Sequence, residues 1–162
     1  MPEMTAIGID PGLTGALAFV RAGHVLTCLD MPVETGAGNR RRVSAARLAH
    51  LLREQVERHG PCVAALEAVA ARPGQGVSSV FSFGRSLGVL EGVLAACAIP
   101  VAYYQPTAWK RALGLLGRPK DASLTRALEL FPTAAPWLMR KKDHGRADAI
   151  LLAHRRLTEA DR

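Results

Sequence analysis

The order of short apolar segments is the feature of this sequence that most constrains its fold. Residues 5–10 (TAIGID) form an apolar, β-favouring run that stops at Pro11 and Gly12, as a buried strand does when it ends in a turn. Residues 16–20 continue as a second strand, and residues 25–31 return as a third after a short hairpin turn. The chain therefore opens with an antiparallel series of strands.

The rest of the chain alternates helices with short strands. Residues 33–42 are rich in Gly, Asn and Arg and predict a loop, after which Ser44 can cap a helix that runs to about Arg58. Further strands are expected at residues 62–67 and 101–104. Further helices are expected at residues 78–98, 107 to about 116, 122–130 and 145 to about 157. Strands in a hairpin series, followed by strands that alternate with helices, predict an α/β layer fold with a mixed sheet.

Length and composition are those of one compact domain. The 162 residues are 49% hydrophobic and 22% charged, and no uninterrupted run of about 18 apolar residues predicts a membrane span. The opening MPEMTAIGIDPG lacks the basic and apolar parts of an export signal, so we expect a cytoplasmic protein. Cys28, Cys62 and Cys97 stand singly in apolar stretches, which is typical of core residues rather than of a disulfide framework.

The chain is basic, with a formal net charge of +7 and a calculated pI of about 10.0. Such a balance is compatible with a polyanionic partner, although it also serves solubility alone. The basic residues gather in four clusters in predicted loops or at helix ends: Arg40 to Arg42, Lys110 with Arg111, Arg118 with Lys120, and Arg140 to Lys142. Each cluster alone is typical of a solvated loop, but loops that converge at one edge of a sheet can line a path for phosphates.

Three carboxylates occupy unusual places. Asp10 ends the first strand, Glu67 ends a later and almost wholly apolar strand, and Asp148 lies in the apolar segment RADAILLAHRRL. Taken alone, Asp10 could instead cap the turn that follows it, and Glu67 could instead be a surface residue at the end of a strand. Together they need a compensating charge, and a divalent cation would supply it. Oxygen ligands without Cys or paired His favour magnesium or manganese over zinc.

Four blocks of sequence resemble, in order, the signature blocks of RuvC-type Holliday-junction resolvases, particularly those of phages and chloroplasts. The blocks are GIDPGLTGALAF (8–19), AALE (64–67) followed by RPGQGVSSVFSFGRSLGVLEG (72–92), PTAWKRALGL (106–115) and KKDHGRADAILLAH (141–154). Sugar kinases and actin-like ATPases also begin with a motif similar to the first block. All four in this order are far more specific.

The resemblance implies a single ribonuclease-H-like domain over residues 1–162, built on a mixed five-stranded sheet flanked by helices. It implies a homodimeric, metal-dependent endonuclease that resolves four-way DNA junctions by paired nicks. Two Mg²⁺ ions per active site, replaceable by Mn²⁺, would cut to leave a 5′-phosphate and a 3′-hydroxyl. By the same resemblance Asp10, Glu67 and Asp148 are metal ligands, with Asp10 bridging both ions.

The fourth metal-site residue is open between two neighbours. Some RuvC proteins carry Asp or His three residues before the final Asp, where this chain has Gly145. The chloroplast-type pattern has an acidic residue five before, which is Asp143, and His144 stands four before. On a regular helix His144 lies about 40° from Asp148 and Asp143 about 140° away. Because Gly145 can mark the helix entry and leave Asp143 free to turn inward, we expect Asp143 as the ligand. His144 is then a nearby metal or phosphate contact, or an exposed residue at the helix start.

The resemblance and the basic clusters also indicate the DNA contacts. Phe81 or Phe83 could stack on an unpaired base, although a Phe on a helix is usually a core residue. Some RuvC proteins have an aromatic three residues after the Glu, but here that residue is Ala70. Lys110 or Lys120 could neutralise charge on the phosphoryl oxygens, and Trp109 is expected to be a packing anchor. The expected DNA contacts are Arg72, Gln75, Ser78, Ser79, Phe81, Phe83, Lys110, Arg118, Lys120, Lys141 and Lys142.

The sequence is compatible with three alternatives. The first is a RuvC-like nuclease that acts as a monomer on other branched DNA or on RNA. The second is an actin-like phosphotransferase, which would need a second nucleotide-binding half that 162 residues hardly accommodate. The third is a catalytically silent junction-binding protein, which is disfavoured because every expected acidic position is filled.

Overall fold

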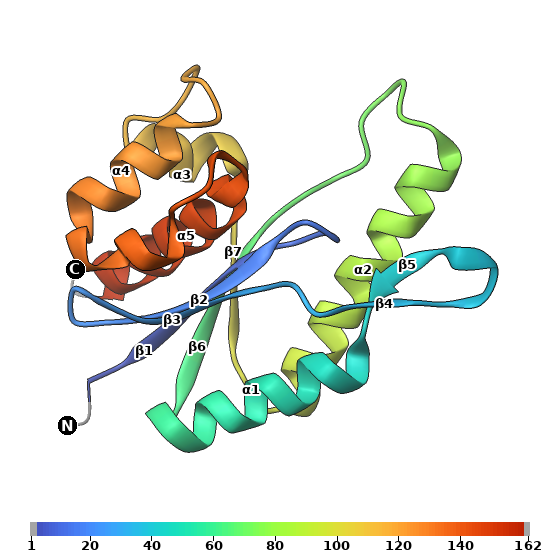
Figure 1. Cartoon of the computed structure of the whole chain (residues 1–162), viewed down its shortest axis with the longest axis horizontal. Coiled ribbons are helices and arrows are strands. Elements are labelled where there is room, and N and C mark those ends of the chain that lie inside the picture. Colours follow the sequence, from blue (N-terminus) through green and yellow to red (C-terminus); the bar gives the residue numbers. More distant parts are fainter. Residues whose placement is uncertain (1–2, 161–162) are drawn as a thin grey trace.

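The computed structural model describes residues 3–160 and has a mixed five-stranded sheet at its centre (Figure 1). Its strands are β1 (Thr5–Asp10), β2 (Ala16–Arg21), β3 (His24–Asp30), β6 (Cys62–Glu67) and β7 (Val101–Tyr104). They lie in the order β3-β2-β1-β6-β7. The first three strands are antiparallel neighbours, whereas β6 runs parallel to β1 and β7 parallel to β6. The predicted α/β fold with a mixed sheet is confirmed.

Helices cover both faces of this sheet. On one face pack α1 (Ala45–His59) and α2 (Val77–Ala96); on the other pack α3 (Pro106–Ala112), α4 (Ala122–Leu130) and α5 (His144–Ala160), as Figure 1 shows. Short 3-10 helices, η2 (Pro132–Trp137) and η3 (Lys141–Asp143), lead from α4 into α5. Because strand side chains alternate between faces, Ile7 and Ile9 of β1 enter the core beside α1 and α2, and Asp10 takes the α5 side.

The loop predicted for residues 33–42 is wrong, because the segment forms a small hairpin. It consists of β4 (Val33–Thr35), the 3-10 turn η1 (Ala37–Asn39) and β5 (Arg41–Val43). Gly38 and Asn39 have positive φ values of 68° and 56°, which reverse the chain, and an ion pair of 2.7 Å joins Arg42 Nε to Glu34 Oε1 across the strands. In Figure 1 this hairpin lies beside α2.

The helix predicted from residue 107 to about 116 is shorter than expected. It ends at Ala112, and Gly114 follows with a φ of 72°, a left-handed conformation that does not continue a helix. The other predicted helices and strands are confirmed to within a few residues. Cys28 and Cys62 are buried and Cys97 is partly buried, as expected of core residues.

A close approach of α5 to β1 positions the functional end of the sheet. At Gly8, in the middle of β1, a Cβ atom would lie 1.7 Å from the carbonyl oxygen of Ala149 on α5. Only glycine leaves room for backbone contact at that distance. The helix therefore lies directly on the strand, and residues before Ala149 reach the end of β1.

The two halves of α2 differ in their surroundings. Leu90 and Leu94 in the second half are fully buried in the core, whereas Val77 and Phe81 in the first half are 86% and 73% exposed. By length and composition only, α2 is also apolar enough to cross a membrane. Its first half therefore presents apolar side chains that nothing in residues 3–160 covers.

Candidate active site

Two parallel strands bring Asp10 and Glu67 to neighbouring positions. In the register of β1 and β6, Ile9 pairs with Leu66, so the next residue on each strand is a carboxylate at the end of that strand. Ile9 and Leu66 both pack in the core on the α1 side, and the following side chains therefore take the α5 side. Adjacent strands lie about 4.8 Å apart, which places the two carboxylates side by side.

The first turns of α5 bring Asp148 to the same place. At Gly145, one turn before Asp148, a Cβ atom would lie 2.9 Å from Oδ2 of Asp10 and 3.1 Å from the carbonyl oxygen of Thr14. A side chain at this position would displace its neighbours. Gly8 and Gly145 together let α5 come close enough for Asp148 to face the ends of β1 and β6. We call Asp10, Glu67 and Asp148 the carboxylate cluster.

Burial and mutual repulsion raise the pKa values of the carboxylate cluster. Burial, followed by the charges of Asp148 and Glu67, raises the pKa of Asp10 to about 8. Burial likewise raises the pKa of Glu67 and of Asp148, and the charge of Asp148 adds to the effect on Glu67. These carboxylates are partly buried and close enough for their charges to act on one another, so water screens their repulsion incompletely.

Two residues of α3 partly offset this repulsion. The indole Nε1 of the fully buried Trp109 donates a hydrogen bond of 3.0 Å to Oε1 of Glu67. The ammonium group of Lys110 acts to lower the pKa of all three carboxyl groups, and its Nζ lies 5.3 Å from the centre of the Trp109 ring. The expected packing role of Trp109 is confirmed. Its bond to Glu67 was not predicted, although the adjacent Lys110 was a signal for this segment.

The chemistry of the cluster fits a divalent cation. Oδ1 of Asp148 is buried and has no hydrogen-bond partner among residues 3–160, which is costly unless another group compensates it. Hard carboxylate oxygens are the ligands that Mg²⁺ and Mn²⁺ prefer. In the described residues, no three His, Cys, Asp or Glu side chains converge as ligands of one ion, so an ion at the cluster would require these side chains to move closer together.

The structure does not bring Asp143 to the carboxylate cluster. Asp143 is only 3% exposed and accepts bonds from Arg140: backbone N at 2.8 Å, Nε at 2.9 Å and Nη2 at 2.6 Å. Burial acts to raise the pKa of Asp143, but the bonds from Arg140 outweigh it and hold the pKa below its ordinary value. The side chain does not turn inward because it is bonded to the segment that precedes α5.

His144 lies closer to the cluster than Asp143 does. It begins α5, one turn before Asp148, and its charge acts to lower the pKa of that carboxyl group. Lys120 acts on Asp148 in the same direction. Of the two candidates for the fourth position, His144 thus acts on the Asp148 carboxyl group, whereas Asp143 is bonded to Arg140.

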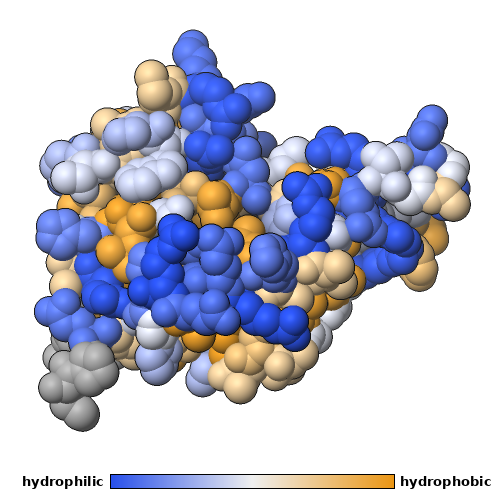
Figure 2. All heavy atoms as spheres, turned by 60° about the horizontal axis from the view of Figure 1, so that its bottom comes forward, coloured by the Kyte–Doolittle hydropathy of each residue, from blue (hydrophilic) through white to orange (hydrophobic). Residues whose placement is uncertain are grey.

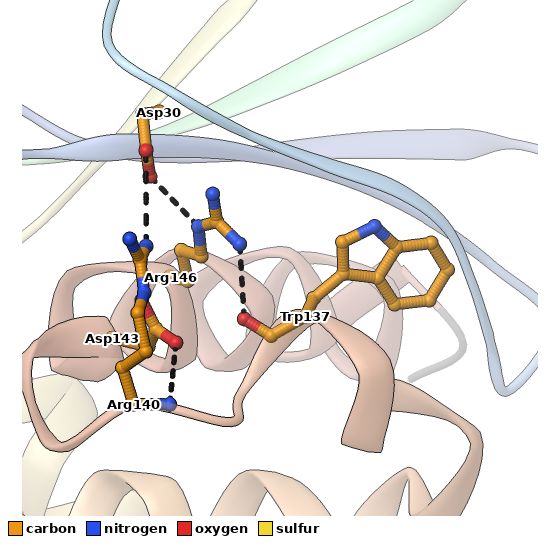
Figure 3. A network of polar contacts seen from close by, with 5 residues as sticks. All are labelled: Asp30, Trp137, Arg140, Asp143 and Arg146. Carbon is orange, nitrogen blue, oxygen red and sulfur yellow. Dashed lines mark hydrogen bonds and ion pairs between the residues drawn. The ribbon is translucent and has the colours of Figure 1, made fainter.

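Figure 3 shows the network that holds Asp143. Arg146 donates from Nε to Oδ1 of Asp30 at 2.7 Å and from Nη1 to the carbonyl oxygen of Trp137 at 3.1 Å. Arg140 Nη2 lies 3.9 Å from Oδ2 of Asp30, besides its bonds to Asp143. This network ties the end of β3 to the segment before α5.

The predicted DNA contacts are mostly at the surface. Ser78, Ser79 and Phe81 are exposed at the start of α2, so Phe81 is not a core residue, whereas Phe83 is partly buried beside Gly12. In the connection before α2, the backbone N of Arg72 donates to Oε1 of Gln75 at 2.7 Å. The basic contacts Arg118, Lys120, Lys141 and Lys142 are exposed, and Lys110 is partly buried.

Sequence comparisons point to one family. A family model described as crossover junction endodeoxyribonuclease RuvC matches residues 6–129. A crossover junction endodeoxyribonuclease RuvC from Nitratidesulfovibrio vulgaris is 34% identical over 165 residues, which cover 96% of this chain and 95% of that protein. The chloroplastic Holliday junction resolvase MOC1 of Chlamydomonas reinhardtii is 38% identical over 118 residues. The match covers 72% of this chain but only 13% of the length of the Chlamydomonas protein.

Solved structures show the same fold. RuvC of T. thermophilus in complex with a Holliday junction substrate superposes with a TM-score of 0.63 at 19% identity, covering 97% of this chain and 92% of that one. The yeast mitochondrial Holliday junction resolvase Ydc2 gives a TM-score of 0.54 at 14% identity, covering 95% of this chain and 80% of that one. The predicted ribonuclease-H-like arrangement of sheet and helices is thereby confirmed.

Proposed function

The chain belongs to the RuvC family of crossover junction endodeoxyribonucleases, and from this premise we propose that it resolves four-way DNA junctions by nicking two opposed strands. The observation that carries the proposal is the carboxylate cluster, in which three partly buried carboxylates from β1, β6 and α5 lie close enough for their charges to interact, and the buried Oδ1 of Asp148 has no hydrogen-bond partner among residues 3–160. A structural role for these carboxylates would not require such unfavourable surroundings.

We propose that Asp10, Glu67 and Asp148 hold two divalent cations, Mg²⁺ by preference, with Mn²⁺ able to replace it. When bound, such ions activate a water molecule and stabilise the leaving oxygen of a phosphodiester, which yields a 5′-phosphate and a 3′-hydroxyl. The charges of both Asp148 and Glu67 act on the Asp10 carboxyl group, so Asp10 is suited to contact both ions. The raised pKa of Asp10 supports this role, because it means that the charged carboxylate is unfavourable among its neighbours. A nearby cation would favour the charged form.

The neighbouring residues of this chain orient and balance the carboxylate cluster. Trp109 fixes the direction of the Glu67 carboxylate through its indole donor. Lys110 and Lys120 supply positive charge where negative charge builds up on the phosphoryl group. We assign the fourth place beside Asp148 to His144, and the role of holding η3 in place to Asp143.

We further propose that two copies act together, because two-fold symmetry matches one active site to each of two opposed strands. The exposed first half of α2 supports such a contact. Gly84, Gly88 and Gly92 repeat every four residues along α2 from the end of that half onward, and a Cβ atom at each would have no neighbour within 4 Å among residues 3–160. Phe81 on the same helix is free to stack on an unpaired base at the branch point. An actin-like phosphotransferase is no longer supported.

The proposed place of action is the cytoplasm, because several relatives are bacterial. An organelle is an alternative location, because one relative is chloroplastic. The proposed nucleic-acid partner is branched DNA rather than RNA. The exposed basic side chains around the cluster would contact its phosphates, which is the usual source of affinity in such complexes.

The test compares three substrates in magnesium: a synthetic four-way junction, a linear duplex of the same sequence and an RNA–DNA hybrid. We expect symmetric nicking of the junction alone, with a ligatable 5′-phosphate at each nick, and no cutting by Asp10→Asn. Junction cutting that survives in Asp10→Asn would contradict the metal site. Equal cutting of the duplex or hybrid would mean that the protein is a nuclease without a preference for junctions.

A further inference from the structure

A second surface adjoins the carboxylate cluster. A cavity of about 1070 Å³ opens between the first turns of α1, the end of β3 and the segment that leads into α5. Thr14, Gly15 and His144 lie on its wall. Gly15 packs against the backbone of Asp10, and His144 precedes the glycine that touches the Asp10 carboxylate, so the cavity begins where the cluster ends.

The lining of this cavity is strongly basic. Its cations are Arg41, Arg47, Arg140, Lys142 and Arg146. Its carboxylates are Asp30 and Asp143, which leaves an excess of three positive charges. We call this cavity the arginine groove. Figure 2 turns the side of the molecule that carries α1 toward the reader, and hydrophilic side chains cover much of this face. The lobe at the right of Figure 2 lies where Figure 1 places the β4–β5 hairpin.

The cations of the groove fall into two groups. Arg140 and Arg146 are occupied by Asp30 and Asp143 and form a fixed wall. Within residues 3–160, Arg41 and Lys142 make no ion pair, and the Arg47 guanidinium donates a hydrogen bond of 3.0 Å to the neutral carbonyl oxygen of Val33. The charges of Arg41, Arg47 and Lys142 are therefore free to meet an anion.

We propose that the arginine groove holds the phosphate backbone of the DNA strand that continues from the bond cut at the carboxylate cluster. The inference rests on the proposed function, because it places the same substrate one step further along the surface. Three uncompensated cations on separate elements, α1, β5 and η3, suit an extended chain of phosphates rather than one small anion. The clusters that contain Arg41 and Arg140 were expected from the sequence as a possible path for phosphates, whereas Arg47 and Arg146 lie outside those clusters.

Binding measurements test the groove separately from cutting. In the Asp10→Asn background, fluorescence anisotropy gives the Kd for a labelled four-way junction across a series of salt concentrations. We expect Arg41→Ala with Arg47→Ala to raise the Kd about tenfold and to reduce the slope of log K against log salt by about 2, since each lost phosphate contact removes about 0.9. Arg41→Lys with Arg47→Lys should restore most of the slope because it keeps both charges.

Arg53→Ala with Arg58→Ala is the matched control. It also removes two positive charges, here both from α1, and neither arginine lines the groove. A Kd and slope that change equally in both double variants would overturn the groove and leave only general charge. Thermal unfolding by circular dichroism shows that the variants fold, which is expected because Arg41 and Arg47 are exposed.

Neutral linkages locate the strand. Junctions with single methylphosphonate linkages are placed at successive positions on either side of the cut bond. We expect a run of positions on one side to weaken binding of the parent protein but not of the Arg41→Ala, Arg47→Ala variant. Equal sensitivity of both proteins at every position would contradict the proposal.

The groove and the proposed function can fail separately. If the groove variant binds as the control does while the wild type still resolves junctions, the groove fails and the proposed function stands. If the wild type cuts no junction, the proposed function fails regardless of the groove.

Discussion

Asp143 and Asp148 are five residues apart in one segment, yet their surroundings are opposite. Asp143 accepts three bonds from Arg140, and its pKa lies below the ordinary value of an aspartate. Asp148 keeps one buried oxygen without a partner, and its pKa is raised by burial. Both oxygens of the first carboxylate are satisfied by Arg140, whereas the second has a side-chain hydrogen bond with Ser123 and keeps its other oxygen unpaired.

The contrast extends to the groups around each carboxylate. Asp30, Arg140 and Arg146 join Asp143 in a network in which each charge meets an opposite one. Asp10 and Glu67 join Asp148 with only Lys110 close enough to oppose the charge of all three. Partly buried like charges are relieved either by protonation or by an external cation, so we expect a structural role for Asp143 and a functional one for the carboxylate cluster.

The largest effect is expected from Asp148→Asn. Junction cutting should fall by at least about 10³-fold, because the substitution removes a proposed ligand of the metal centre. The melting temperature of the protein in EDTA should rise at pH 8, since one of three mutually repelling charges is gone. Single-turnover cleavage and thermal unfolding measure the two quantities. A lower melting temperature in EDTA would show that the Asp148 charge is already compensated.

Asp143→Asn should act in the opposite direction. Losing the charge-assisted bonds from Arg140 should cost about 2 kcal/mol, which lowers the melting temperature by about 6 °C. Cutting at 25 °C should stay within about tenfold of the wild type. Arg140→Gln is the matched partner, and the double variant should lose little more than either single variant. A loss of cutting as large as that of Asp148→Asn would restore Asp143 as the fourth metal ligand.

The pH dependence of stability also separates the two groups. The folded pKa of Asp10 is about 8, against an unfolded value near 4, so the folded protein retains a proton that the unfolded chain has released. The stability that this group contributes is complete below pH 4 and is lost as the pH rises to about 8. Asp143, whose pKa is lowered, contributes stability that is present above pH 4 and is lost on acidification.

In EDTA, raising the pH from 5.5 to 8 should therefore cost about 3 kcal/mol of folding stability and lower the melting temperature by about 9 °C. Magnesium should reverse this fall at pH 8 and have little effect at pH 5.5, because binding requires the charged carboxylate. Asp10→Asn should remove both the fall and its reversal. Calorimetric scans at the two pH values measure these effects, and a melting temperature that rises with pH in EDTA would mean that Asp10 is ionised without metal.

The sheet and the positions of Asp10 and Glu67 were predictable because both depend on local signals. Residues 5–10 and 62–67 are apolar runs that end at a carboxylate, and each ends a strand where the sequence indicates. Parallel strands that end at the same edge place their final residues together. The hairpin at residues 33–43 was missed because its short strands carry exposed arginines in place of an apolar alternation.

The place of Asp143 could not be read from spacing. Helical geometry and the pattern of chloroplast-type relatives gave different answers, and neither includes the bond from Arg140, which depends on how the chain enters α5. The same holds for Trp109, whose donor meets Glu67 from another element 42 residues away. Gly145 was read as a possible helix entry, whereas its contact with Asp10 shows that it is needed for the close approach of α5.

The smallest effect tests whether the carboxylate cluster is oriented as well as charged. Trp109→Phe keeps most of the buried ring and removes the indole donor to Glu67, which is worth about 0.5–1.5 kcal/mol. The magnesium concentration for half-maximal cutting should rise about 3- to 10-fold. The rate at saturating magnesium should change little, because a bound ion still orients the Glu67 carboxylate without the indole donor. Trp137→Phe is the control, since only the backbone carbonyl of Trp137 takes part in the network of Asp30 and Arg146. A lower rate at saturating magnesium would show that Trp109 shapes the reacting geometry itself. An unchanged midpoint would leave the charge of the carboxylate cluster, rather than its orientation, as the property that distinguishes it from Asp143.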